Sequence, residues 1–187
     1  MISFKKNGLL FVSFLAFTVL HGQYTIAPEP GYTPQIGVMV DMLEDLKDRI
    51  TGQVRDLNQE QTDHLIDPQA NSIGAMVMHL VATESYYQVE TLEERQWTGE
   101  EAGLLQLASG LGPESREQLK GRPIQYYLEL WDEVRKKTLS GLKKRDDTWF
   151  ASNIEEGINN HWVWFHVLEH MAAHMGQIDL VKKRLPQ

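Results

Sequence analysis

The stretch that decides the fold lies near the C-terminus and reads His161-Trp-Val-Trp-Phe-His-Val-Leu-Glu-His-Met-Ala-Ala-His-Met-Gly-Gln177. His170 and His174 are four residues apart, so on a helix their side chains lie one above the other on the same face. Two imidazoles in this arrangement can bind one metal ion. Because H-x-x-x-H arises easily by chance, the pair gains meaning only if another helix supplies a third ligand.

The spacing of apolar residues predicts four long amphipathic helices. Their expected ranges, each beginning at a capping residue or a first-turn proline, are 33–57, 72–94, 123–142 and 159–185. Two loops, 58–70 and 146–157, and a long crossover connection at 95–121 join them, and the crossover has one short helical candidate at 101–107. No segment alternates with the period of a strand. We therefore predict an all-α fold, a four-helix bundle with one long crossover connection, over residues 35–185.

The N-terminus has the pattern of a signal peptide. Lys5 and Lys6 precede an apolar run from Leu9 to Leu20, and Gly22 is a small residue suited to cleavage. We predict that residues 1–22 are removed, so that the protein is exported, periplasmic or secreted, with no stable membrane span after cleavage. Residues 23–34 contain three prolines and a glycine and are expected to form an extended lead-in.

Charge and cysteine content exclude several functions. Without the two lysines of the signal peptide, the domain has 16 basic against 26 acidic side chains, a net charge of about −10 with histidine neutral. Such a surface repels phosphate backbones, so we expect no nucleic-acid partner. The absence of cysteine excludes disulfides, thiolate metal ligands and a cysteine nucleophile.

A third ligand candidate lies in the second predicted helix. Heptad-like steps trace the inward line of the fourth helix through Val163, Val167, His170, His174, Gln177 and Val181, and that of the second helix through Ser72, Met76, His79, Thr83 and Tyr86. A lone histidine on an apolar helix is more often a hydrogen-bonded core residue than a ligand. Two partners at ligand spacing on another helix shift the balance for His79 towards ligation. Three neutral imidazoles suit Zn²⁺, Ni²⁺, Fe²⁺ or Mn²⁺.

The segment from Ser72 to Tyr86 with His79, together with the ending Glu169-His170-Met-Ala-Ala-His174-Met-Gly-Gln177, resembles the DinB/YfiT-like superfamily of metal-binding four-helix proteins. The resemblance covers residues 35–185 and implies that His79, His170 and His174 bind a divalent metal ion. Known members include thiol-dependent transferases and isomerases, and others are described as hydrolases. Three protein ligands leave a position at which the ion can activate water or polarise a substrate oxygen.

Three further residues are candidates for a supporting role at this site. His166 lies one turn before His170, and we expect it to flank the inward line and bond a neighbouring side chain rather than bind the ion. Gln177 can orient a metal-bound water or a substrate, or make a hydrogen bond across the bundle. Glu84 lies five residues after His79 and points about 140° away from it, which favours a solvated carboxylate over a hydrogen bond to an imidazole.

Aromatic residues accompany both helices, at Tyr86, Tyr87, Trp97, Trp162 and Trp164. Packing is the usual role of aromatic residues at helical spacing, and an apolar wall for a substrate is the alternative.

These observations support two hypotheses of function. The leading one is an exported metal-dependent hydrolase or transferase that acts on a small molecule at the three-histidine site. The alternative is a non-catalytic metal- or ligand-binding helical bundle, either a monomer or a homodimer. It is supported by the lack of an Asp or Glu at an inward position beside the histidines. The substrate and the metal are open at this stage.

Overall fold

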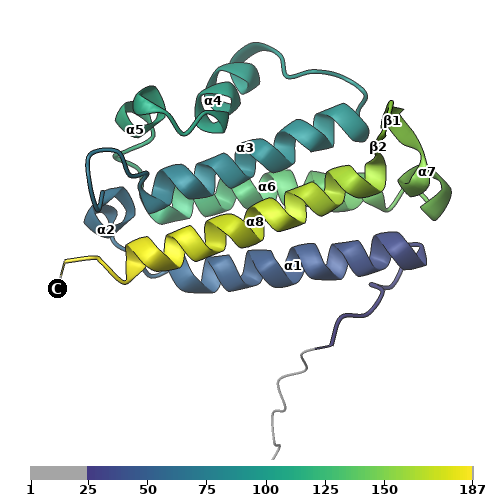
Figure 1. The fold of residues 1–187 in the computed structure, drawn as a ribbon, viewed down its shortest axis with the longest axis horizontal. Coiled ribbons are helices and arrows are strands. Elements are labelled where there is room, and N and C mark those ends of the chain that lie inside the picture. The colour runs from purple at the N-terminus through teal and green to yellow at the C-terminus, as the bar shows by residue number, and fades with distance from the viewer. Residues whose placement is uncertain (1–24, 187) are drawn as a thin grey trace, which may run out of the picture.

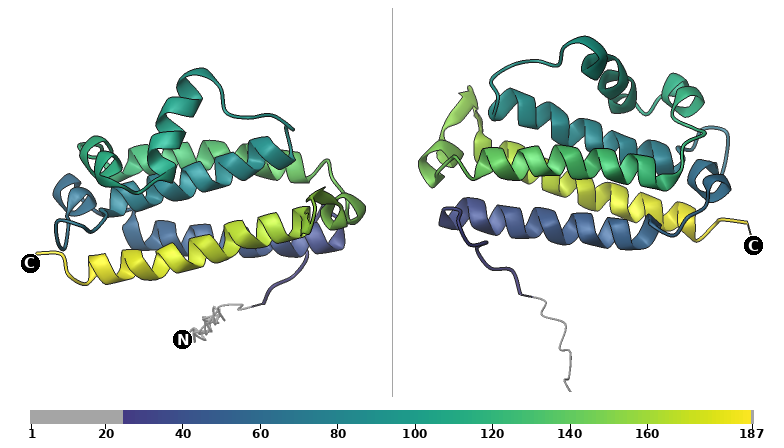
Figure 2. Two further views of the ribbon diagram at one scale, coloured as in Figure 1. Left: turned by 45° about the horizontal axis from the view of Figure 1, so that its top comes forward. Right: turned by 180° about the vertical axis from the view of Figure 1, so that it is seen from behind.

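The computed structural model describes residues 25–186 and shows a mostly helical chain, which confirms the all-α class (Figure 1). Four long helices lie side by side: α1 (Pro34–Val54), α3 (Ile73–Thr91), α6 (Ile124–Leu142) and α8 (Asn160–Lys182). Helix α3 packs against both α6 and α8, and α1 also packs against these two helices (Figure 2). The predicted signal peptide, residues 1–22, lies outside the described residues. No helix within residues 25–186 is long and apolar enough to cross a membrane.

The segments predicted as loops contain short elements that the apolar spacing did not indicate. These are α2 (Gln59–Asp63), α5 (Pro113–Gln118), α7 (Asp147–Ala151) and the antiparallel strands β1 (Asn153–Glu155) and β2 (Ile158–Asn159). The short helical candidate of the crossover is the longer α4 (Gly99–Ser109). Local polar contacts set the starts of α2 and α7, since the Asn58 and Asp146 side chains accept hydrogen bonds from backbone N–H groups in the first turn. Hydrophobic periodicity cannot detect helices this short.

The apolar face of α1 is turned inward, and its residues Ile36, Leu43 and Ile50 are fully buried. The line traced on α3 is wrong at Tyr86, and the line traced on α8 is wrong at Gln177 but right at Val181, which is buried. Tyr86 is 44% exposed, and Gln177 is exposed while its neighbour Ile178 is buried. These departures leave both histidine-bearing helices with polar or aromatic side chains at the molecular surface.

Glu84 is buried in an ion pair, so the prediction of a solvated carboxylate is wrong. Its two oxygens accept hydrogen bonds from Arg135 at 2.7 and 2.8 Å, and Trp131 Nε1 donates a third at 2.8 Å. Arg135 also donates to the Leu43 carbonyl and to Glu44, at 2.8 and 2.6 Å. Burial alone would raise the pKa of Glu84, but the adjacent guanidinium and these hydrogen bonds hold the pKa below its usual value. The contacts join α1, α3 and α6 inside the protein.

The start of α1 is capped from a distant part of the chain. The Asp147 carboxylate accepts a hydrogen bond from the Thr33 hydroxyl at 2.5 Å and bonds the backbone N–H groups of Gln35 and Ile36 at 3.2 and 3.3 Å. We expect Asp147→Ala to lower the melting temperature by about 2–4 °C, the usual effect of losing one cap in a domain of this size. Thermal unfolding followed by circular dichroism measures this, with Asp48→Ala, an exposed acid on α1, as the control. A fall no larger than that of the control would contradict the capping role.

Candidate metal centre

Three histidines from two neighbouring helices meet inside the protein. His79 lies near the middle of α3, and His170 and His174 lie one turn apart on α8, which packs along α3. The ring centroid of His79 lies 4.9 Å from that of His170 and 4.9 Å from that of His174, and the centroids of His170 and His174 are 4.6 Å apart. One ligand nitrogen from each residue lies within 4.8 Å of the other two. The structure therefore brings together the three residues that the sequence suggested as ligands.

The crossover connection fixes the orientation of His79. Its Nδ1 lies 3.0 Å from the carbonyl oxygen of Ala108 in α4. A carbonyl oxygen only accepts, so Nδ1 carries the proton and, in the neutral imidazole, Nε2 keeps its lone pair. That Nε2 lies 2.8 Å from Nε2 of His170. The lone pair of His79 is thus directed at its partners, which is how a metal-binding histidine is commonly held.

The environment keeps the imidazoles neutral. Burial and then the neighbouring histidines lower the pKa of His170 to about 4, with Glu169 opposing the shift. Burial and His79 likewise lower the pKa of His174 to about 4, and the hydrogen bond that His174 donates to Gln177 opposes the shift. Burial also lowers the pKa of His79. Because a metal ion binds only the neutral imidazole, the three side chains are in the required form near neutral pH.

The three imidazoles are suitable ligands for a small divalent cation, and the distance between their nitrogens is close to the one that such an ion requires. Nδ1 of His174 is buried without a hydrogen-bond partner among the described residues, a condition that disfavours a purely structural role. Tetrahedral Zn²⁺ with Zn–N bonds of about 2.0–2.1 Å separates its nitrogens by about 3.3 Å. The 2.8 Å contact between His79 and His170 is shorter than this, so the rings must part by roughly half an ångström to admit an ion.

The supporting residues suggested by the sequence have different positions in the structure. His166 is half-buried and its Nδ1 lies 2.9 Å from Glu169 Oε1, so it flanks the cluster and bonds a neighbour, as expected. Gln177 is exposed, and its contact is with His174. Glu84 is hydrogen-bonded to Arg135 and Trp131 and not to the histidines. The carbonyl of Ala108 does support an imidazole, and a backbone group of this kind has no signal in the sequence.

A cavity of about 330 Å³ adjoins the cluster. Two of the three histidines line it, His79 and His170. Most of the remaining wall is aromatic or small, and its residues are Ala82, Thr83, Tyr86, Tyr87, Trp97, Ser109 and His166. A molecule in this cavity can reach the histidine cluster from one side.

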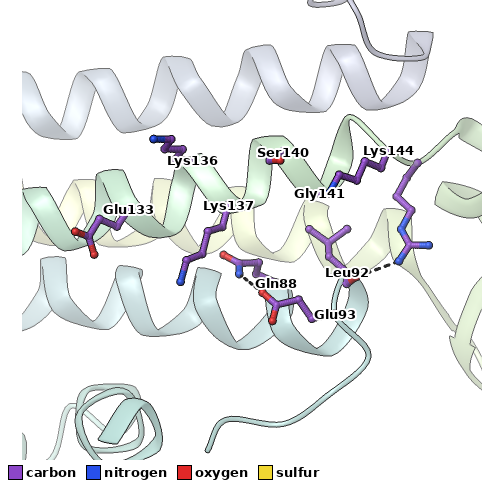
Figure 3. A pocket seen from close by; sticks show the side chains of 10 residues that line it. Gln88, Leu92, Glu93, Glu133, Lys136, Lys137, Ser140, Gly141 and Lys144 are labelled. Carbon is purple, nitrogen blue, oxygen red and sulfur yellow. Dashed lines mark hydrogen bonds between the residues drawn. The ribbon is translucent and has the colours of Figure 1, made fainter.

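A larger cavity, of about 760 Å³, lies elsewhere, between the C-terminal ends of α3 and α6 (Figure 3). No histidine lines it. Its wall carries charges of both signs, including Glu93, Glu133 and Lys137, and on the α3 side Gln88 donates a hydrogen bond to Glu93 at 2.8 Å. Size alone therefore does not identify the site, and the smaller cavity is the one with metal-binding chemistry.

The fold and the cluster together define a class of protein: a helical protein in which three histidines from two neighbouring helices can hold a divalent metal ion beside a cavity. Residues 38–187 match the family described as MST, mycothiol-S-transferase. The chain therefore belongs to this family, which is part of the DinB/YfiT-like superfamily, and the resemblance seen in the sequence is confirmed. Comparison with curated proteins gave no match.

Proposed function

We propose that this protein is a metal-dependent transferase that joins a small thiol to an electrophilic small molecule. The proposal rests on one observation: three neutral imidazoles converge at the wall of a ligand-sized cavity. The family to which the chain belongs is described as a thiol transferase, which supports this choice over hydrolysis. In this proposal α1, α3, α6 and α8 form the four-helix bundle of the superfamily, and Zn²⁺, Ni²⁺, Fe²⁺ or Mn²⁺ binds to His79, His170 and His174.

His79, His170 and His174 would hold a divalent ion, which when bound would lower the pKa of a thiol in the cavity and so favour the thiolate nucleophile. The residues of the chain orient the histidine ligands and shield the thiol from water. The Ala108 carbonyl holds His79 in one tautomer, and burial keeps His170 and His174 unprotonated. The apolar wall of the cavity limits the water that competes with the thiol.

His166 is the group best placed to receive the proton that the thiol loses. Its Nδ1 faces the Glu169 carboxylate at 2.9 Å, and since an ionised carboxylate only accepts, Nδ1 is the protonated nitrogen. The other nitrogen, Nε2, is then free to accept a proton in the cavity that His166 lines.

The test combines metal analysis with an activity assay. Protein purified without chelator is expected to contain close to one divalent ion per chain, and to accelerate the conjugation of a small thiol to a fluorogenic electrophile. Chelation should abolish the acceleration, and one added equivalent of metal should restore it. Hydrolysis of the electrophile in the absence of thiol would favour a hydrolase, and bound metal without either activity would favour the non-catalytic metal-binding protein.

Metal binding should depend steeply on acidity. The pKa values of His170 and His174 lie near 4 in the folded protein, below the usual value of 6.5. Both imidazoles are therefore neutral at pH 6, and protons compete with the ion as the pH falls towards 4. We expect metal to be retained on dialysis at pH 6 and released between pH 5 and 4. Loss that is complete at pH 6 would contradict the low pKa values.

The same pKa values predict how the stability of the metal-free protein changes with pH. The two histidines bind protons more readily in the unfolded chain, where their pKa is about 6.5, than in the fold, where it is about 4. The free energy of unfolding of the metal-free protein is therefore highest above pH 6.5 and decreases as the pH falls from 6.5 to about 4. The half-exposed position of His170 makes its share of this loss smaller.

We also propose that the protein is exported after cleavage before Gln23, acts without a nucleic-acid partner, and forms a homodimer. The basic and apolar pattern of residues 1–22 supports export, and the net charge of −8 for the whole chain disfavours nucleic acid. Exposed apolar side chains on α8, at Trp162, Phe165 and Leu180, favour self-association. Mass spectrometry of the mature protein and light scattering after size-exclusion chromatography test these points.

A further inference from the structure

We propose that the cavity beside the histidine cluster binds a flat aromatic group as part of the electrophilic substrate, and that the cavity wall by itself disfavours a negative charge on that group. This inference rests on the proposed function for the reaction, but the binding itself can be measured without turnover. It is carried by the arrangement of aromatic rings around the cavity and by the charges that surround them.

Five rings follow one another along the wall. Trp162 stacks on His166 at 5.2 Å with an angle of 3°, and His166 meets Tyr87 edge-on at 5.7 Å. Tyr87 meets Tyr86 edge-on at 5.0 Å, and Tyr86 meets Trp97 edge-on at 5.5 Å. The series begins on α8, crosses to α3 and ends on the connection before α4. Four of these rings line the cavity, all except Trp162.

Core packing accounts for only part of this wall, because Tyr87 and Trp97 pack against the hydrophobic core whereas Tyr86 is exposed. Tyr86 is 44% exposed and Trp162 is 46% exposed, so both keep large apolar areas in contact with solvent. Trp97 is held in place by a polar contact, because its Nε1 donates to Ser85 Oγ at 3.2 Å. Tyr86 and Trp97 also line an adjoining cavity of about 210 Å³, so the two rings are open to a ligand on two sides.

The charges around the wall disfavour an anion. No lysine or arginine lines the cavity of about 330 Å³. Carboxylates stand beside its rings: Glu90 accepts a hydrogen bond from the Tyr86 hydroxyl at 3.5 Å, and Glu169 bonds His166. Arg95 lines the adjoining cavity, where Glu93 pairs with it at 2.6 Å. In the metal-free protein, an aromatic group with no charge or a positive charge meets ring faces and acidic neighbours, whereas a negative group meets repulsion. A divalent ion on His79 and His170, which line the cavity, would weaken this preference.

Binding can be measured with three probes of similar size: benzyl alcohol, benzyltrimethylammonium and benzenesulfonate. Each is titrated into the mature protein, both metal-free and zinc-loaded, and followed by ligand-observed NMR. In the metal-free form, where the wall alone sets the charge preference, we expect the neutral and cationic probes to bind, and the anionic probe to bind at least about tenfold more weakly. Equal or tighter binding of benzenesulfonate to the metal-free form, or no binding of any probe, would overturn the inference.

Two variants locate the probe. Trp97→Leu and Tyr86→Ser are each expected to weaken binding of benzyl alcohol about tenfold. Tyr86→Ser alters an exposed side chain, so it keeps the test valid if Trp97→Leu does not fold. Tyr126→Ser, at a tyrosine of α6 that lines neither cavity, is the matched control and should leave binding unchanged. Unchanged binding in both cavity variants would place the probe elsewhere and refute the site.

Metal content measured on the same samples separates this inference from the proposed function. Bound metal with no aromatic binding refutes the inference alone. Aromatic binding to a protein that takes up no metal supports the aromatic site and refutes the metal-dependent transferase.

Discussion

The double variant His170→Ala, His174→Ala is expected to lose divalent metal almost completely, from near one ion per chain to below a tenth of that. Only His79 then remains of the three converging nitrogens. Loss of a group that merely supports a ligand costs 10–100-fold in affinity, so loss of two direct ligands should cost more than about a thousandfold. Elemental analysis of protein dialysed against trace metal measures this, together with the dissociation constant for Zn²⁺.

A matched control removes two other histidines. His64 lies after α2 and His161 stands exposed at the start of α8, stacked on Phe150 at 4.3 Å. His64→Ala, His161→Ala should retain the metal content of the unaltered protein. Near-stoichiometric metal in the His170, His174 variant would refute the metal centre, and equal loss in both variants would point to non-specific binding by imidazoles.

The histidine cluster could be found from the sequence because helix geometry is regular over short distances. His170 and His174 are one turn apart, so their shared face does not depend on the rest of the fold. Tracing an inward line over two heptads is less reliable, because a helix drifts about 20° per heptad from a strict seven-residue repeat. Tyr86 and Gln177 each lie fourteen residues from the start of their traced lines and face the surface, whereas Val181, five helical turns after Val163, is again buried.

The position of Glu84 depends on the surroundings of α3, which its own sequence does not reveal. The carboxylate points away from His79, and that direction was expected to face solvent. In the structure α3 is covered by α4, α6 and α8, so most directions around it lead to protein. The crossover connection supplies one of these covers and also the Ala108 carbonyl that orients His79. Neither contact follows from hydrophobic spacing.

Replacing Arg135 with methionine is expected to destabilise the fold by about 3–5 kcal/mol, the usual effect of removing one partner from a buried ion pair. Glu84 is 1% exposed and would remain inside without its cation, bonded only by Trp131 and neighbouring polar groups. Urea unfolding at pH 7 measures the change in the free energy of unfolding. Lys136→Met, at the exposed neighbouring position on α6, is the matched control and should change stability by less than about 0.5 kcal/mol.

Two further measurements distinguish an uncompensated charge from lost packing. Adding Glu84→Gln to Arg135→Met removes the buried charge, so the double variant should recover at least about 2 kcal/mol. In Arg135→Met alone, burial without a cation should raise the pKa of Glu84 above its value in the unfolded chain. The folded state then binds a proton more tightly than the unfolded state, so the destabilisation should shrink as the pH falls from 7 to 5. A loss of stability that is independent of pH and unaffected by Glu84→Gln would mean that Arg135 acts through its packing and its bonds to Leu43 and Glu44.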